Sequence, residues 1–376
     1  MPLRDSRTAL RIDWYLLIPT CIIAIFGLFT MASFEGAETV VVRQVIWLLL
    51  SVAVFLFLSE RGYGFLKKTN IVVSLYVASL GLLALLFAVG HIAKGAQKWF
   101  SVGGFSFQPS DLAALALIIL LAKYFSRRHV EIANVRHIIV SGVYALLMFV
   151  LIFFQPDFGS ALIIFCIWLG MILVSGVSKR HLLFVGVLGL VAFGTLWIYG
   201  LKDYQKHRIT NFLHPLSDVR GSGYNAYQAM IAVGSGQILG KGIGYGTQSR
   251  LNFLPEYKTD FIFAAFAEEW GLVGVALLFA CFAALIGRII VLAYHGATNF
   301  EILFGLGVAI FFMSHFLINV GMCLGLLPVT GITFPFMSYG GTNILVSYIG
   351  LGILAGMSRY GRDVHKEREQ NEFLGL

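Results

Sequence analysis

Apolar residues along this chain fall into long, nearly uninterrupted runs. A helix that crosses a bilayer needs about 20 mainly apolar residues, and ten segments have this length and character. They lie at 13–33, 40–59, 70–90, 109–126, 137–154, 158–176, 182–201, 262–291, 300–325 and 341–358. The pattern predicts an all-α polytopic membrane protein with ten transmembrane helices.

Composition agrees with a surface that faces lipid. Charged residues make up 12% of the chain, roughly half of the usual share of about 25%, which is too few to cover soluble cores and excludes a soluble enzyme. Most of the 27 Lys and Arg residues fall in segments that are cytoplasmic if both termini are cytoplasmic. Because the positive charges are divided between two sides of a membrane, the net charge of +8 reflects topology and does not indicate a nucleic-acid partner.

The sequence predicts one membrane domain over residues 1–376, without a linker or a soluble domain. The longest stretch outside the spans is 202–261, between the seventh and eighth helices, and the predicted orientation makes it a large extracytoplasmic loop. Residues 359–376 form a charged cytoplasmic tail. A loop as long as 202–261 in a compact protein is usually functional.

Two acids near the outer side follow similar motifs. Asp111 follows Gln108-Pro109-Ser110, and Asp157 follows Gln155-Pro156. Proline at the first helical position and an acid in the first turn are typical of a helix start. Two interpretations are equally consistent with these motifs. Either each acid serves only to stabilise the start of its helix, or both acids face one outer cavity.

Three more acids, Asp260, Glu268 and Glu269, lie at the start of the eighth span. An ionisable group in a span is costly and indicates function by default. If Asp260 is already helical, its spacing from the other two, just over two turns, puts all three on one face.

The glycine-rich segment 231–248 resembles a phosphate-binding loop only superficially. Ser235 stands where a P-loop needs glycine, and Gly242 stands where it needs serine or threonine. Two interpretations stay open: glycines that permit tight turns, and a backbone nest for a diphosphate.

Metal-binding motifs are absent from the sequence. The nine His residues are scattered and form no H-E-x-x-H motif or Cys/His cluster, so a zinc site is not expected. His315 and Asn319, one turn apart in the ninth span, are expected to hydrogen-bond across helices. Trp99 is either an interfacial anchor or a ring that stacks on a sugar.

Ordered motifs along nearly the whole chain resemble one known family. They include Gln108-Pro109-Ser110, Gln155-Pro156-Asp157, Gly240-Lys241-Gly242, Gly246-Thr247-Gln248, Thr259-Asp260-Phe261, Ala267-Glu268-Glu269-Trp270 and Ser338-Tyr339-Gly340-Gly341. On these motifs the chain is similar to the SEDS family, the shape, elongation, division and sporulation proteins. The stretches around Lys241 and Glu268 resemble the elongation branch more than the division branch.

This resemblance implies a peptidoglycan glycosyltransferase of the inner (cytoplasmic) membrane with its active site facing outside. Its substrate is lipid II, an undecaprenyl-diphosphate disaccharide-pentapeptide, which it polymerises into glycan strands during cell elongation. The implied partners are a class B penicillin-binding transpeptidase and other membrane proteins of the elongation complex. The essential acid of the family maps onto Asp260, and its outer-cavity residues map onto Trp99, the Gln108 turn and Asp157.

The chain departs from the family pattern at three positions. Asp111 stands where the family usually has Glu, Ala114 where it often has Lys, and Lys258 where it usually has His. Because the usual lysine partner is missing, we expect Lys258 or Arg43 to neutralise Asp111.

Transfer of a sugar from a diphosphate requires a base for the acceptor hydroxyl and a cationic clamp for the leaving group. Asp260 is our candidate for the base, and the displacement inverts the anomeric centre without a second nucleophilic acid. We expect Arg208, ahead of the other loop cations, to bind the diphosphate. A divalent cation, Mg²⁺ or Mn²⁺, held by Asp260 and the phosphates is a further expectation. The expected substrate contacts are Arg43, Trp99, Gln108, Asp111, Asp157, Arg208, Lys241, Lys258 and Ser338.

Three alternatives remain at this stage. A lipid II flippase would also need an outer cavity with charged residues. A scaffold for partner proteins would tolerate loss of Asp260. A division member of the same family would share the chemistry and differ in its cellular role.

Overall fold

A computed structural model gives the fold of the chain. It describes all residues except 1–11, 34–35, 37, 94–95, 103–104, 128–134, 178, 201–205, 207–209, 211, 213–222, 252, 255 and 375–376. The helices are α1 Trp14–Ala32, α2 Glu38–Arg61, η1 Gly64–Lys67, α3 Thr69–Val89, α4 Pro109–Ser126, α5 Val135–Phe154, α6 Phe158–Val174, α7 Lys179–Thr195, η2 Leu196–Gly200, α9 Tyr224–Ser235, α10 Thr247–Arg250, α11 Ile262–Tyr294, α12 Asn299–Cys323 and α13 Gly341–Leu374. The strands are β1 His91–Ala93, β2 Ala96–Val102 and β3 Phe105–Phe107.

Helices cover all ten segments predicted to span the membrane. Among the described residues, eight helices are long and apolar enough to cross a bilayer: α1 to α5 and α11 to α13, with α13 counted to Arg359. Helix α6 is apolar with 17 residues, and α7 continues into the π-helical turn η2. The chain is therefore a multi-pass membrane protein.

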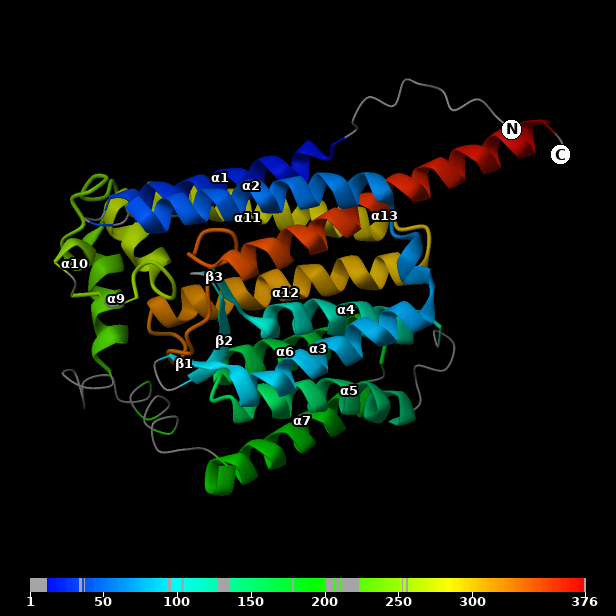
Figure 1. Cartoon of the computed structure of the whole chain (residues 1–376), viewed down its shortest axis with the longest axis horizontal. Helices are drawn as coiled ribbons and strands as arrows, with labels where there is room; N and C mark the ends of the chain where they lie inside the picture. Colours follow the sequence, from blue (N-terminus) through cyan, green and yellow to red (C-terminus); the bar gives the residue numbers. More distant parts are fainter. Residues whose placement is uncertain are drawn as a thin grey trace.

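The long helices run roughly parallel to one another (Figure 1). The start of α1 and the end of α13 lie at one end of the bundle, which we call the terminus end. The sheet, α9 and α10 lie at the opposite end, which we call the loop end. This arrangement agrees with an even number of crossings.

A small sheet lies between α3 and α4 at the loop end. Its strands are antiparallel in the order β1-β2-β3, with Trp99 opposite His91 and Phe100 opposite Phe107. The all-α prediction misses this sheet, because a search for long apolar runs does not detect short strands between two spans.

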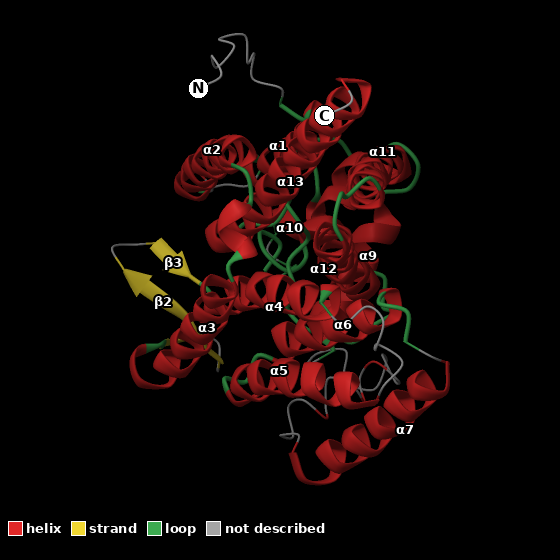
Figure 2. Cartoon of the chain, turned by 90° about the vertical axis from the view of Figure 1, so that its right-hand side faces the viewer, coloured by secondary structure: helices red, strands yellow, loops and turns green. Residues whose placement is uncertain are grey.

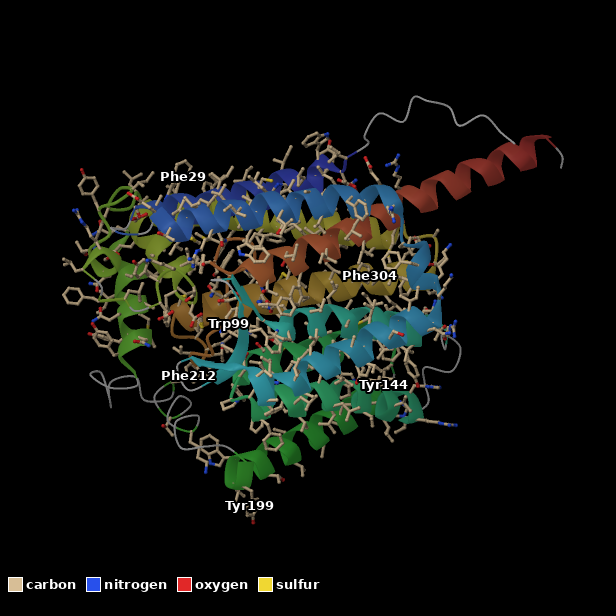
Figure 3. All side chains as sticks on the ribbon, in the orientation of Figure 1. Phe29, Trp99, Tyr144, Tyr199, Phe212 and Phe304 are labelled. Carbon is tan, nitrogen blue, oxygen red and sulfur yellow. The ribbon has the colours of Figure 1, made fainter. Side chains whose placement is uncertain are left out.

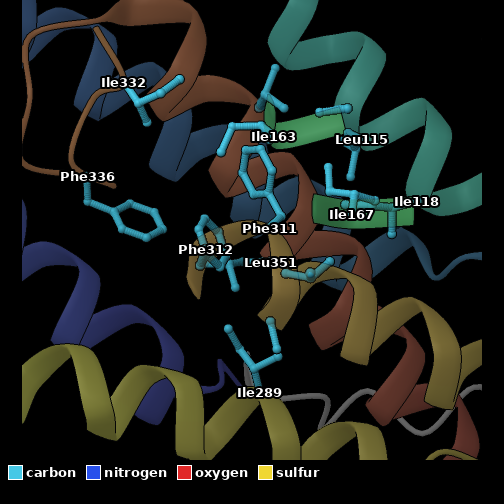
Figure 4. Close-up of a cluster of buried hydrophobic side chains, with 14 of the residues drawn as sticks. Leu115, Ile118, Ile163, Ile167, Ile289, Phe311, Phe312, Ile332, Phe336 and Leu351 are labelled. Carbon is cyan, nitrogen blue, oxygen red and sulfur yellow. The ribbon is translucent and has the colours of Figure 1, made fainter. Parts of the chain in front are cut away.

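Helices α4, α12 and the first part of α13 form the centre of the bundle. In the apolar stretch of α4, 78% of residues are buried, compared with 17% in α2, which lies at the margin. Small residues permit this close packing: a Cβ atom at Gly307 would lie 2.6 Å from the side chain of Ile118. Figure 4 shows part of the apolar core, where Leu115 and Ile118 of α4 lie close to Phe311 and Phe312 of α12. Viewed from the terminus end, α7 lies at the edge of the bundle (Figure 2).

Helix α11 is kinked close to its start. Gly271 has φ 65° and ψ −167°, which lie outside the helical region, and a positive φ favours glycine. The kink separates the first part of the helix, 262–270, which is buried except at Trp270, from the long remainder. This first part follows directly after the turn that holds Asp260.

Candidate functional site

Asp260 lies in a turn at the loop end, before the first residue of α11. The N–H groups of Thr259 and Phe261 both donate to the carbonyl of Glu256, at 3.1 Å. Because α11 begins two residues after Asp260, Asp260 is not helical. The prediction that Asp260, Glu268 and Glu269 share one helical face required a helical Asp260. That requirement is not met.

Side chains from distant parts of the chain hold this turn. The side-chain amide of Asn319, in α12, donates to the carbonyl of Asp260 at 2.8 Å and to that of Ile332 at 2.6 Å. The hydroxyl of Ser338 donates to the carbonyl of Thr259 at 2.6 Å. Asn319 is fully buried, and it bonds a turn and a loop. Nδ1 of His315 likewise lies 3.3 Å from the carbonyl oxygen of Thr333, in the loop after α12. The prediction that these two residues hydrogen-bond across helices is therefore wrong, because their partners are backbone carbonyls of non-helical segments.

The carboxylate of Asp260 faces a glycine. A Cβ atom at Gly331 would lie 3.3 Å from Oδ2 of Asp260, and Gly331 has φ +76°. Lys258 lies in the same turn, where its carbonyl accepts from the N–H of Tyr339 at 2.9 Å and its ammonium lies 5.2 Å from the ring centre of Tyr257. The turn therefore combines a carboxylate and an ammonium on a backbone held by other segments.

A second group of polar residues surrounds Asp157, which is 3% exposed. As N-cap of α6, Asp157 accepts from the N–H and hydroxyl of Ser160, at 3.3 and 2.7 Å. It also accepts from Nε2 of Gln108 at 3.2 Å and forms an ion pair with Lys98 at 3.7 Å. The prediction of helix starts at both motifs is confirmed, because α4 begins at Pro109.

Asp111 is buried beside the same group. Its carboxyl is hydrogen-bonded to the side chain of Asn343, and it interacts electrostatically with Asp157 and Lys98. Lys98 is a cation near both acids, with its ion pair to Asp157, and neutralisation of Asp111 by Lys258 or Arg43 stays a prediction. The two acids come together at the loop end, where both are buried, and an outer cavity shared by them stays a prediction.

The segment 338–343 connects the Asp260 turn with the acid group. Ser338 binds the Asp260 turn, and the hydroxyl of Thr342 accepts from the N–H of Gln108 at 3.1 Å. Asn343 then contacts the carboxyl of Asp111.

Helix α2 supports the start of this segment. Nε2 of Gln44 donates to the carbonyl of Ser338 at 3.0 Å, and its Oε1 accepts from the N–H of Gly340 at 3.3 Å. The ring of Trp47 lies so close that a Cβ atom at Gly341 would be 2.2 Å from it. The buried Gln44 is a supporting residue that sequence analysis missed, although it is polar within an apolar run.

The sheet places Lys98 beside the acid group, as its ion pair with Asp157 shows, and Trp99 follows it in β2. Both side chains are half-buried, and Figure 3 shows Trp99 at the loop end of the bundle. This position fits either of the two roles expected for Trp99.

Lys241 is paired within the protein. Its ammonium lies 2.7 Å from Oε1 of Glu268, and this oxygen also accepts from the N–H and hydroxyl of Thr247, at 2.9 and 3.0 Å. The side chain of Glu268 is fully buried. Binding of substrate by Lys241 stays a prediction, and it would have to compete with this ion pair.

The glycine-rich segment 231–248 packs against α11. Gly240, Gly242 and Gly244 all have positive φ, and a Cβ atom at Gly240 would lie 2.1 Å from the carbonyl oxygen of Glu269. These contacts support the interpretation that the glycines permit tight turns.

Two further cations were predicted to contact substrate, Arg43 and Arg208. Arg43 is exposed on α2, next to Gln44, and Arg208 lies outside the described residues.

Within the part of the chain that the structure describes, no three His, Cys, Asp or Glu side chains come together as a metal site. One carboxylate such as Asp260 together with substrate phosphates is a usual way to hold Mg²⁺. The residues present fit a cation bound jointly with substrate.

The fold and site define a multi-pass membrane protein with an acid-lined region at one end of its helical bundle. The sequence profile of the FtsW, RodA and SpoVE family, described as cell cycle proteins, matches residues 8–363. The chain belongs to this family, also called SEDS.

Named relatives share much of the chain. The peptidoglycan glycosyltransferase MrdB of Escherichia coli K12 is 37% identical over 78% of this chain and 79% of its own length. Stage V sporulation protein E of Bacillus subtilis is 32% identical over 93% and 98%, respectively. A probable peptidoglycan glycosyltransferase FtsW of Hydrogenovibrio crunogenus is 32% identical over 99% and 98%.

Two solved structures have the same fold. A chain of a peptidoglycan synthase complex that coordinates polymerisation and crosslinking superposes with a TM-score of 0.80, at 31% identity, over 94% of this chain and 99% of that chain. The rod shape determining protein RodA of Thermus thermophilus superposes with a TM-score of 0.70, at 29% identity, over 93% and 97%.

Proposed function

We propose that this chain is a peptidoglycan glycosyltransferase that polymerises lipid II on the outer face of the cytoplasmic membrane during cell elongation. The observation that carries the proposal is the turn in which Asp260 is held by Asn319 and Ser338, at the same end of the bundle as the acid group. The names of MrdB and FtsW support the activity. The RodA structure, from a rod shape determining protein, supports the role in elongation.

In this proposal the loop end faces outward and the terminus end faces the cytoplasm. The ten helices that cover the predicted spans would each cross the membrane. The distribution of Lys and Arg supports this orientation. Lipid II presents its sugars and diphosphate at the outer membrane boundary, where the turn of Asp260 would then lie.

Asp260 acts as the general base. Its carboxylate takes the proton of the acceptor sugar hydroxyl, whose oxygen attacks the anomeric carbon of the donor. A new glycosidic bond forms, the bond from this carbon to the diphosphate breaks, and undecaprenyl diphosphate leaves with the electron pair. Attack from the face opposite the leaving group inverts the centre.

The remaining site residues bind the two substrates. Sugar and peptide groups would contact Trp99, Gln108, Asp111, Asp157 and Ser338, and the diphosphate would contact Arg43, Arg208, Lys241 or Lys258. A divalent cation held by Asp260 and the phosphates would supply further positive charge for the leaving group. Of these cations, Lys258 lies closest in sequence to Asp260 and shares its turn.

A class B penicillin-binding transpeptidase and other elongation proteins are the proposed partners. Support comes from the structural similarity to a chain of a synthase complex that combines polymerisation with crosslinking.

The test uses the purified protein, with and without a cognate class B transpeptidase, incubated with lipid II and Mg²⁺ or Mn²⁺. Glycan polymer is read on a gel for wild type and Asp260→Asn, with thermal melting as the folding control. Polymer from wild type alone supports the proposal. Equal polymer from both proteins excludes Asp260 as the base, and no polymer from wild type with its partner favours a flippase or scaffold.

A further inference from the structure

Residues 236–248, which we call the strap, cross α11 at its kink. In a regular helix the N–H groups of Leu272 and Val273 would bond to the carbonyls of Glu268 and Glu269. Here the strap replaces both bonds. The four substitutes are Leu272 N–H to the Gln237 carbonyl (2.9 Å), Val273 N–H to the Ile238 carbonyl (3.1 Å), Lys241 N–H to the Glu268 carbonyl (3.0 Å) and Gly242 N–H to the Glu269 carbonyl (3.0 Å).

Side chains reinforce this connection. The carboxylate of Glu268 accepts hydrogen bonds from the ammonium of Lys241, from the hydroxyl and N–H of Thr247, and from the N–H of Gln248 at 3.1 Å. We call this set of contacts the Glu268 network. A buried carboxylate that accepts several charge-assisted or backbone hydrogen bonds fixes its surroundings strongly.

The neighbouring carboxylate connects the strap to α1. Oε1 of Glu269 accepts from the hydroxyl of Ser33 at 2.7 Å and from the N–H of Gly244 at 3.1 Å. The strap is thus held by two consecutive acids of α11, Glu268 and Glu269.

The part of α11 that these acids belong to leads directly to Asp260. Residues Ile262 to Glu269 are each at most 2% exposed, and Phe266 and Trp270 stack at 5.5 Å between ring centres. A helical segment packed on all sides moves as a unit. Its first residue follows the Asp260 turn, so a shift of the segment would shift the carboxylate.

We propose that the Glu268 network positions Asp260. In this proposal Glu268 and Lys241 are positioning residues that keep segment 262–270 in the place that aligns the Asp260 carboxylate for catalysis. This inference rests on the proposed function, because its readout is glycan polymerisation. It gives Lys241 a different role from a diphosphate clamp. The two roles predict different kinetics.

A positioning role acts on the chemical step, whereas a clamp acts on binding. Displacement of a reacting group by about 1 Å can cost about 100-fold in rate. We therefore expect Lys241→Met and Glu268→Gln each to lower kcat by about tenfold or more and to leave KM within about twofold of wild type. Because both changes break one network, the double variant should be little worse than either single variant.

The experiment measures kcat and KM for polymerisation with lipid II and the partner transpeptidase, alongside thermal melting. Lys68→Met is the matched control, since Lys68 is exposed and belongs to the terminus end. A covalent rescue adds a second readout, and thermal melting of the reduced and oxidised forms separates it from the general gain in stability that a disulfide brings. A Cβ atom at Gly244 would lie 3.9 Å from Cβ of Ser33, close to the disulfide mean of about 3.8 Å.

The pair Ser33→Cys and Gly244→Cys, placed in the Lys241→Met background, is compared before and after oxidation. We expect the disulfide to restore most of kcat by holding the strap, and a reductant to remove this gain. Strain from the positive φ of Gly244 is shared by both forms, so it cancels in the comparison.

The outcomes separate this proposal from the function on which it rests. No polymer from wild type overturns the proposed function and this proposal with it. Wild-type activity with unchanged kcat in Lys241→Met and Glu268→Gln overturns the positioning role alone. A rise in KM for Lys241→Met, with Glu268→Gln unaffected, assigns Lys241 to the diphosphate.

Discussion

Two pairs of buried acids, Asp13 and Glu301 at the terminus end and Asp111 and Asp157 at the loop end, are held differently. At the terminus end, Asp13 accepts two hydrogen bonds from the guanidinium of Arg288, at 3.1 and 2.6 Å. Glu301 accepts from the hydroxyl of Tyr63 and from the N–H of Ala297 at 3.0 Å. Each acid there joins two segments that are distant in the sequence.

At the loop end, Asp111 and Asp157 lie together near the ammonium of Lys98. Asp157 is bound mainly by neutral donors, with Lys98 at 3.7 Å, and Asp111 is bound by Asn343. A bidentate Arg–carboxylate pair is stronger and more rigid than a single long contact with lysine.

If Asp111 and Asp157 bind substrate as proposed, this difference separates structural acids from substrate-binding acids. A carboxylate whose hydrogen-bond partner is fixed within the protein, such as Asp13 beside Arg288, gains little binding free energy from a ligand. Two acids that share one partly exposed lysine can gain from hydroxyl and amide groups of an incoming sugar and peptide. The comparison therefore predicts that changes at the loop end affect activity and changes at the terminus end affect stability.

The largest effect is expected at Asp260. Asp260→Asn removes the proposed base, and loss of general base catalysis costs about 10²- to 10⁴-fold in rate. The hydrogen bonds that hold the turn use backbone carbonyls, so the melting temperature should stay close to that of wild type. Initial rates of lipid II polymerisation and thermal melting check both statements, and a rate within threefold of wild type would remove the assignment.

The matching change at the terminus end is Arg288→Met. It leaves the carboxylate of Asp13 without its bidentate partner, and hydrogen bonds to charged groups contribute about 1.5–3 kcal/mol. We expect a loss of about 2 kcal/mol in the free energy of unfolding and a polymerisation rate near wild type once the protein is folded. Unchanged melting together with lost activity would contradict the division of roles between the two ends.

A smaller effect is expected for Lys98→Met, which removes the ammonium that pairs with Asp157 at 3.7 Å and also interacts with Asp111. Since these acids are proposed to bind substrate, we expect KM for lipid II to change by about tenfold, equivalent to about 1.4 kcal/mol. Lys67→Met, at the terminus end, is the control. Equal kinetics in the two variants would show that the charge of Lys98 is not used.

The sequence alone predicted the helices well. Bilayer crossing demands long apolar runs, so all ten segments are visible without knowledge of their packing. Pro109 and Asp157 also mark their helix starts, because proline and an N-cap acid act through local backbone groups. Asp260 was identified as a candidate because it is an acid at the boundary of a span and because it matches the essential acid of the family.

What surrounds Asp260 could not be predicted in the same way. Asn319 and Ser338 reach the turn from positions 59 and 79 residues away in the chain, and such contacts depend on how the helices pack. The partner of Lys241 is a similar case, since Glu268 lies 27 residues further on. The sheet was missed because its strands are short and depend on their pairing.

The smallest effect within the comparison concerns single hydroxyl groups on α6. Ser160→Ala removes a 2.7 Å hydrogen bond to Asp157, worth about 1 kcal/mol, and loosens the carboxylate that Gln108 and Lys98 also bind. We expect KM for lipid II to rise by about threefold to fivefold. Ser175→Ala, at the other end of the helix, is the control, because its hydroxyl binds only the carbonyl of Ile172 in its own last turn among the contacts described. If both serines change melting alike and neither changes KM, the acids of the loop end are as structural as those of the terminus end.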